Sequence, residues 1–206
     1  MTFRWYFLPP VIALALVARI SLHHSSASVG ESLELRIAEE TLLIPAAYVE
    51  GKPTQGEKPA FFFFAFGPTL APLPDDALVF LLRPIPEAVS RFGYYPIINI
   101  LLTPAPRTRD LQALMISAAN VYRAEAAPDG SYSTPPWFSG SKHSFRAMAS
   151  GYAHCVSEVP NPGCSLYFSH RSLLVKMNYS ITNFPDSGDL IPAARRLLDS
   201  FSERSP

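Results

Sequence analysis

Proline is the feature that most constrains the fold of this chain, because 21 prolines are spread through its 206 residues. Proline fixes φ and lacks a backbone N–H, so it interrupts helices and is kept out of the interior of sheets. Here the prolines separate runs of apolar residues, as where the run at residues 41–44 ends at Pro45. We therefore predict short strands and irregular connections, with few long helices.

The composition is that of a folded domain rather than a disordered chain. Hydrophobic residues make up 48% of the chain and charged residues 17%, with 14 Phe and 9 Tyr, which is enough for a sizeable core. The formal net charge is +0 and there is no run of Lys or Arg, which argues against a nucleic-acid partner. Once an N-terminal segment is set aside, the length suits one domain.

The N-terminus carries a charged residue followed by an apolar run. Arg4 precedes residues 5–18, none of which is charged. This order is typical of a secretory signal peptide. A helix of this length spans roughly 21 Å, which is short of the roughly 30 Å hydrocarbon core of a bilayer.

Two outcomes stay open for this N-terminal segment. Small residues at Ser25 and Ala27 offer a cleavage site, which would release a soluble exported protein. If the segment is not cleaved, residues 5–22 form a single-pass membrane anchor, provided that Arg19 reaches the interface. We therefore predict a signal peptide or anchor with its linker over residues 1–27, and one exported domain over residues 28–206.

The two cysteines, Cys155 and Cys164, agree with export. They flank a turn at residues 159–163 that is rich in Pro and Gly, so they can face each other across a hairpin. A disulfide there would stabilise by roughly 2–3 kcal/mol and persists in oxidising compartments. The alternatives are two free thiols and a zinc site with His154 and His170, but the eight residues between the cysteines do not match the usual ligand spacing of about two to four.

The apolar runs predict the strands of a largely antiparallel sheet. We expect strands at residues 32–36, 41–44, 61–66, 77–82, 95–102 and 173–181. Residues 61–66, with the sequence FFFFAF, predict a strand buried on both faces, because the run is short, aromatic and continuous. Residues 173–181 alternate between apolar and polar, which is typical of a strand with one buried face.

Two segments have helical spacing. Residues 108–122 repeat apolar positions at the spacing of a helix, which Thr108 or Asp110 would cap. A second helix begins near Asp189 and carries one apolar stripe. The predicted fold class is α+β, with an antiparallel sheet of about five to seven strands and one or two packed helices after the N-terminal apolar segment.

No motif for catalysis or phosphate binding is present. The sequence lacks a G-x-S-x-G elbow, a glycine-rich phosphate loop and an H-E-x-x-H motif. A hydrolase with an unfamiliar site built from His143, His154 or His170 is the remaining enzymatic alternative. We expect no enzyme activity, no cofactor and no metal.

The long connection at residues 127–142 is the best candidate for function. It is rich in Pro, Gly and Ser, yet it contains Tyr132, Trp137 and Phe138. Aromatic side chains are enriched at binding hot spots, which makes these three the candidate partner-binding residues. The alternative is that they fold back as a lid over a small apolar cluster.

Two short motifs resemble a group of small exported bacterial domains. One is the Ile-Pro-x-x-Tyr turn at residues 44–48, and the other is the helix end at residues 197–201, with the sequence LLDSF. Together they look like Mog1/PsbP-like domains and immunity-type domains, including periplasmic proteins that neutralise type VI secretion effectors. The resemblance covers about 20 residues and implies a non-enzymatic domain that binds a protein partner.

The sequence thus favours an exported protein-binding domain in the bacterial cell envelope, periplasmic and either soluble or anchored to the inner membrane. Its partner would be a protein, such as a toxin or effector that it neutralises. The alternative is a single-pass structural or assembly subunit of an envelope complex.

Overall fold

A computed structural model of the chain divides into two compact units, Met1–Glu31 and Ser32–Pro206. The structure describes residues 32–49, 55–73, 97–106, 110–135, 140–159, 162–181 and 189–202, all within the second unit. The N-terminal apolar segment and the strand expected at residues 77–82 lie outside these ranges. Among the described residues, no helix has the length and apolar character needed to cross a bilayer.

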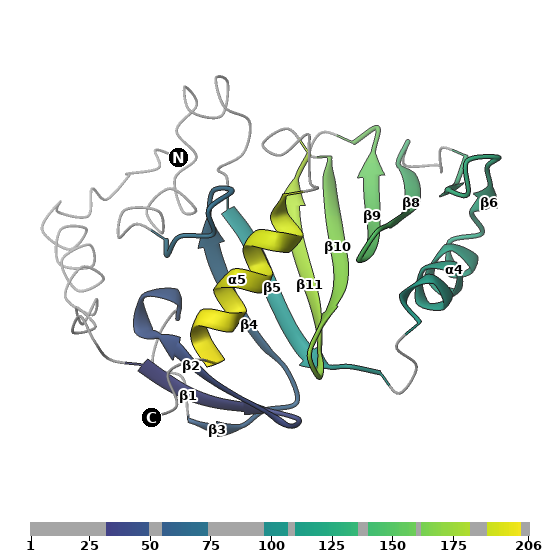
Figure 1. Cartoon of the computed structure of the whole chain (residues 1–206). Coiled ribbons are helices and arrows are strands. Elements are labelled where there is room, and N and C mark those ends of the chain that lie inside the picture. Colours follow the sequence, from purple (N-terminus) through teal and green to yellow (C-terminus); the bar gives the residue numbers. More distant parts are fainter. Residues whose placement is uncertain are drawn as a thin grey trace, which may run out of the picture. The chain divides into compact units, whose positions relative to one another are not determined.

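The described part of the chain is built mainly from strands, with two α-helices (Figure 1). In chain order the elements are β1 (Ser32–Ile37), β2 (Glu40–Pro45), η1 (Ala46–Tyr48), β3 (Gly56–Glu57), β4 (Phe61–Phe66), β5 (Ile97–Pro104), α4 (Leu111–Val121), β6 (Glu125–Ala126), β7 (Tyr132–Ser133), β8 (Lys142–Met148), β9 (Gly151–Ser157), β10 (Gly163–His170), β11 (Leu173–Ser180) and α5 (Leu190–Ser202).

The strands form two sheets. The larger has eight antiparallel strands in the order β4-β5-β11-β10-β9-β8-β7-β6, and the smaller has the order β2-β1-β3, with β3 parallel to β1. The α+β class is confirmed, but the estimate of five to seven strands is wrong. The stretch at residues 145–154 is broken by a turn into β8 and β9, and the connection before it contributes the short strand β7. The first two predicted strands belong to the smaller sheet.

The main core lies on the face of the large sheet that carries α5. The alternation predicted for β11 is confirmed, since Leu173, Val175, Met177 and Tyr179 are buried. The apolar stripe of α5 is confirmed too, and it packs with β2 and β10. Figure 1 shows α5 lying across the strands of the large sheet. Burying one stripe of a helix on one face of a sheet is what gives this layer its stability.

Three aromatic rings from distant parts of the chain meet in this core. Tyr48 lies after β2, Phe63 lies on β4 and Phe201 lies near the end of α5. Their ring centroids are separated by 5.4–5.9 Å in edge-on arrangements, a geometry that aromatic pairs favour. Tyr48 and Phe201 each end one of the two motifs used for the resemblance, so these motifs are in direct contact.

The strand Phe61–Phe66 corrects another prediction. It forms β4, an end strand of the eight-stranded sheet of the described residues, and its side chains are buried on one face only. Phe63 and Ala65 are buried, whereas Phe62 on the opposite face is 58% exposed. A run of aromatic residues shows that a strand is apolar, but its place in the sheet depends on pairing with strands far away in sequence.

Candidate functional site

The helix α4 packs on the face of the large sheet opposite to α5. Within β9, Tyr152 belongs to a cluster under α4, while its neighbour Ala153 belongs to the main core, and successive strand residues point to opposite faces. The α4 cluster is small, and its buried members are Met115, Ala119, Phe145 and Tyr152. Asp110 begins the helix as predicted, because its carboxylate accepts the backbone N–H groups of Gln112 and Ala113.

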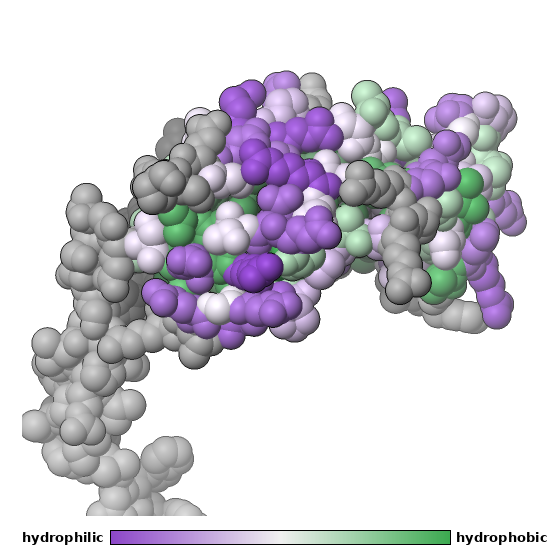
Figure 2. Space-filling model, turned by 60° about the horizontal axis from the view of Figure 1, so that its bottom comes forward, coloured by the Kyte–Doolittle hydropathy of each residue, from purple (hydrophilic) through white to green (hydrophobic). Residues whose placement is uncertain are grey.

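The exposed surface of α4 carries no charge. Its sequence, LQALMISAANV, contains no Asp, Glu, Lys or Arg, and Val121 is 76% exposed. In Figure 2 hydrophobic and hydrophilic residues lie side by side at the right-hand end of the visible face, where α4 lies. Val121 is the one large apolar side chain that this described helix exposes, and its other exposed positions hold Gln, Ala, Ser and Asn.

The structure places one of the three predicted binding residues. Tyr132 lies on β7 directly opposite Phe145 of β8, and it is half-buried against the α4 cluster. Trp137 and Phe138 lie outside the described residues. Tyr132 therefore contributes to packing at the α4 end of the sheet, and its role in binding stays a prediction.

A shallow hollow of about 370 Å³ opens beside this strand. Its lining comes from β6, β7, the start of β8 and the segments next to them: Glu125, Ala126, Ala127, Ser133, Thr134, Pro135 and Lys142. Thr134 is buried and closes the hollow, because its hydroxyl and backbone N–H bond the backbone of His143. The lining of the hollow is mixed, with the polar side chains of Glu125, Ser133 and Lys142 beside two alanines and a proline.

Two histidines lie next to each other under the C-terminal end of α4. Nδ1 of His143 and Nε2 of His154 are 3.0 Å apart, so one imidazole donates a hydrogen bond and the other accepts it. Their rings pack with those of Tyr122 and Phe145, with centroid distances of 4.3–5.1 Å. The sequence alone did not predict this pairing, because β8 and β9 bring the two histidines together only through their register.

Both imidazoles are held in the neutral form. Burial lowers the pKa of His143. Burial, and then the nearby His143 and Lys176, lower the pKa of His154 to about 4. Neutral, stacked and bonded to each other, the two rings act mainly as part of the apolar cluster.

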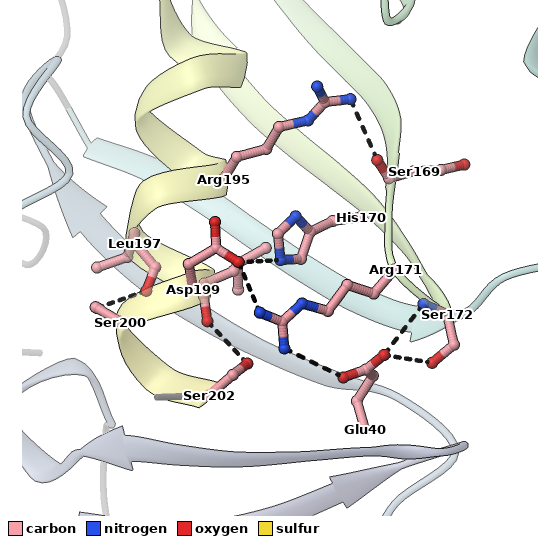
Figure 3. Close-up of polar contacts among 11 residues, drawn as sticks. Glu40, Ser169, His170, Arg171, Ser172, Arg195, Leu197, Asp199, Ser200 and Ser202 are labelled. Atoms are coloured by element: carbon pink, nitrogen blue, oxygen red, sulfur yellow. Dashed lines mark hydrogen bonds and ion pairs between the residues drawn. The ribbon is translucent and has the colours of Figure 1, made fainter. Parts of the chain in front are cut away.

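The third histidine, His170, belongs to the α5 face and to a polar network shown in Figure 3. Its Nε2 lies 3.4 Å from a carboxylate oxygen of Asp199, which accepts a hydrogen bond of 2.9 Å from Arg171. Glu40 completes the network through Arg171 and Ser172. Burial lowers the pKa of His170 despite the nearby Asp199. The network joins α5 to the β10–β11 and β1–β2 turns.

These positions exclude the zinc alternative and confirm the disulfide. Cys155 and Cys164 are bonded to each other across β9 and β10. His154 and His170 lie on opposite faces of the sheet, so they cannot join one four-ligand site with these cysteines. Within the described ranges no group of three or more His, Cys, Asp or Glu side chains is placed to hold a metal ion.

Comparison with known proteins gives a likeness of fold. The sequence matches no protein-family model and no curated protein. The structure is similar to Smlt3025, an immunity protein of the Stenotrophomonas maltophilia type IV secretion system, with a TM-score of 0.53 and 15% identity over 83% of this chain and 93% of that one. It is also similar to FrpD, an iron-regulated outer membrane lipoprotein of Neisseria meningitidis, with a TM-score of 0.51 and 10% identity over 86% and 95% of the two chains.

At these identities the two matches establish the fold alone. The match to Smlt3025 agrees with the predicted resemblance to immunity-type domains. That protein belongs to a type IV secretion system, whereas the prediction named type VI effectors. Neither match shows the likeness to Mog1/PsbP-like domains.

Proposed function

We propose that this chain is an exported, non-enzymatic domain of the bacterial cell envelope that binds and neutralises a protein partner, in the manner of an immunity protein. Two observations support an exported, immunity-type domain. A structure of the same fold is an immunity protein of a secretion system. The bond between Cys155 and Cys164 suits an oxidising compartment outside the cytoplasm.

The observation that carries the proposal is the uncharged, exposed surface of α4. A helix that served only to cover its sheet would direct charges to the solvent, as α5 does with Arg196. The α4 surface instead presents Val121 and small or amide side chains. Interface cores are depleted of charged residues in the same way, so this surface suits a protein partner.

The predicted aromatic residues extend this surface in the proposal. Tyr132 lies on β7 directly before Ser133, which lines the hollow. Trp137 and Phe138 follow in the same connection between β7 and β8. We assign these three residues to partner contact.

Identification of the partner tests the proposal. The full chain, tagged at its C-terminus, would be expressed in its own host, crosslinked and purified from the envelope fraction. We expect one stoichiometric partner that is toxic when expressed alone and harmless when this chain is co-expressed. Cells lacking this chain that stay insensitive to that partner would contradict the proposal.

A matched pair of variants locates the interface. Ser117 on α4 and Ser200 on α5 are both exposed helical serines. Ser117→Arg should lower affinity for the partner at least tenfold, because it places a charge at the core of the interface. Ser200→Arg makes the same chemical change on the other side of the sheet and should leave affinity unchanged.

A second candidate is a single-pass structural or assembly subunit of an envelope complex, and its support is that a protein of the same fold is an outer membrane lipoprotein. This candidate predicts an intact N-terminus, retention in the membrane through residues 5–22, and co-purification of membrane-complex subunits. A soluble periplasmic chain with a cleaved N-terminus would exclude it.

A further inference from the structure

The helix α4 covers only part of its face of the large sheet. It packs on β8, β9 and β10. On the same face, the next strands of the sheet are β11, β5 and β4, which carry side chains that are partly or largely exposed. The exposed Phe62 lies at the far end of this part, over which no helix of the described residues packs.

The strand register lines up two rows of side chains across this surface. The first row runs from Tyr152 and Tyr167 through Lys176 and Leu101 to Phe62. In the second row, His154, Ser165, Asn178, Asn99 and Phe64 are opposite one another in the same way. Directly opposed residues of antiparallel strands share a face and are in contact, so the rows form one continuous layer, from Tyr152, which is buried under α4, to the exposed Phe62.

This surface has aromatic ends and a polar centre. Tyr152 and Tyr167 stack with centroids 4.5 Å apart at the end near α4, and Phe62 and Phe64 pack edge-on at the other end. Between them, the hydroxyl of Ser165 donates a hydrogen bond of 2.7 Å to the side-chain oxygen of Asn178. Aromatic rings around a hydrogen-bonding centre are typical of a surface that binds a protein segment.

Lys176 is the formally charged residue of these two rows. Its Nζ lies 5.5 Å from the ring centroid of Tyr167, and no carboxylate among the described residues forms an ion pair with it. The side chain is half-buried. A cation held on a neutral surface gains most from one anionic group placed directly against it.

We propose that this surface, centred on Lys176, docks a segment of a protein partner that presents one carboxylate between aromatic or aliphatic side chains. The carboxylate would pair with Lys176 and accept hydrogen bonds from the Asn178 and Asn99 amides, while its neighbours pack on Phe62 and Tyr167. The inference rests on the proposed protein-binding function and names the chemistry of the partner.

The charge pattern favours a protein over an anionic membrane. Attraction to anionic lipids generally takes a cluster of about four to eight basic residues, whereas one lysine matches one carboxylate. The aromatic side chains on both sides of Lys176 call for apolar contacts next to that carboxylate.

Selection from a random peptide library displayed on phage tests the proposal with the full chain as bait. We expect the selected peptides to carry Asp or Glu next to aromatic or aliphatic residues. Their affinity should fall at least tenfold in Lys176→Gln. It should also fall several-fold in Phe62→Ser, which changes an exposed side chain and spares the core.

Arg196→Gln is the control, because it removes one positive charge from the exposed surface of α5, on the other side of the sheet. Selected peptides without acidic residues, or equal losses in Arg196→Gln and Lys176→Gln, would overturn the proposal. Binding of phosphatidylglycerol vesicles that depends on Lys176, with no peptide selected, would also overturn it.

The outcome separates this inference from the proposed function. A protein partner that is released by Ser117→Arg, yet binds Lys176→Gln and Phe62→Ser normally, would leave the proposed function standing and remove the docking surface. Acidic peptides that depend on Lys176, with no protective partner in the host, would keep the docking surface and remove the immunity role.

Discussion

The two faces of the eight-stranded sheet are covered very differently. The α5 face carries the large core, the aromatic contacts of Phe201 and an ion-paired network around Asp199. The α4 face carries a cluster with four buried members and a helix without charge. In the described part of the chain the two exposed large hydrophobic residues, Phe62 and Val121, both belong to the α4 side. One face therefore stabilises the domain, and we assign binding to the other.

Truncating one buried side chain on each face should have the largest effect. Phe201→Ala removes a ring that contacts Tyr48 and Phe63 and should lower the free energy of unfolding by about 4 kcal/mol. Met115→Ala should cost about 2 kcal/mol and mainly loosen α4. Urea denaturation combined with hydrogen exchange separates the two effects. Equal and global losses in both variants would show that the faces do not differ in this way.

Removal of the disulfide should affect both faces together, because Cys155 and Cys164 join β9 and β10, which the two faces share. Replacing both cysteines by Ala should lower the free energy of unfolding by about 2–3 kcal/mol, chiefly because the unfolded chain gains freedom. The midpoint of urea denaturation measures the loss. Unchanged affinity for the partner in this variant is expected, and a loss of binding would place the disulfide in the interface.

Mild acid should loosen the α4 side. The pKa of His154 is near 6.5 in the unfolded chain and about 4 in the folded one, so between these values the unfolded state binds more protons. The contribution of neutral His154 to the stability of the folded state is therefore complete above pH 6.5, and it is lost as the pH falls towards 4. Because the side chain is only partly buried, solvent screening limits the loss in the free energy of unfolding to about 1 kcal/mol.

The variant His154→Gln tests this, since an uncharged amide cannot take up the proton. Its stability should fall less between pH 6.5 and pH 4 than that of the unchanged protein, as measured by urea denaturation at each pH. NMR titration of the imidazole of His154 gives its pKa directly. An identical slope in both proteins would assign the acid sensitivity to other groups.

The smallest effect is expected in the polar network of the α5 face. Asp199→Asn removes the ion pair with Arg171. Both side chains are about 40% exposed, so water can hydrate the guanidinium group of Arg171 once its partner is gone. The expected cost is about 0.5 kcal/mol. Arg196→Gln, an exposed change on the same helix, is the control. A loss of several kcal/mol in Asp199→Asn would mean that this face depends on the network more than on its core.

The parts of the fold that depend on local patterns were predictable. The alternation in β11, the stripe of α5, the cap at Asp110 and the cysteine pair across a turn are all encoded by neighbouring residues. The position of β4 was not predictable, because an apolar run does not tell whether a strand will lie at the edge or in the middle of a sheet.

The candidate surfaces were predictable only in part. Tyr132 was singled out because it is an aromatic residue in a segment rich in Pro, Gly and Ser, and it does lie at the α4 end of the sheet. Lys176 was expected to face away from the core, but nothing near it in sequence shows its neighbours. Those neighbours, Phe62, Leu101 and Tyr167, come from three other strands and meet only through the register.

The most direct test of this account is hydroxyl-radical footprinting of the full chain, free and bound to the partner recovered from the envelope. Phe62 and Val121 report on the α4 side, and Arg196 and Pro192 report on the exposed surface of α5. The account predicts that binding protects Phe62 and Val121 from modification and leaves the α5 residues as reactive as before. Protection of α5, with Phe62 and Val121 unchanged, would contradict it.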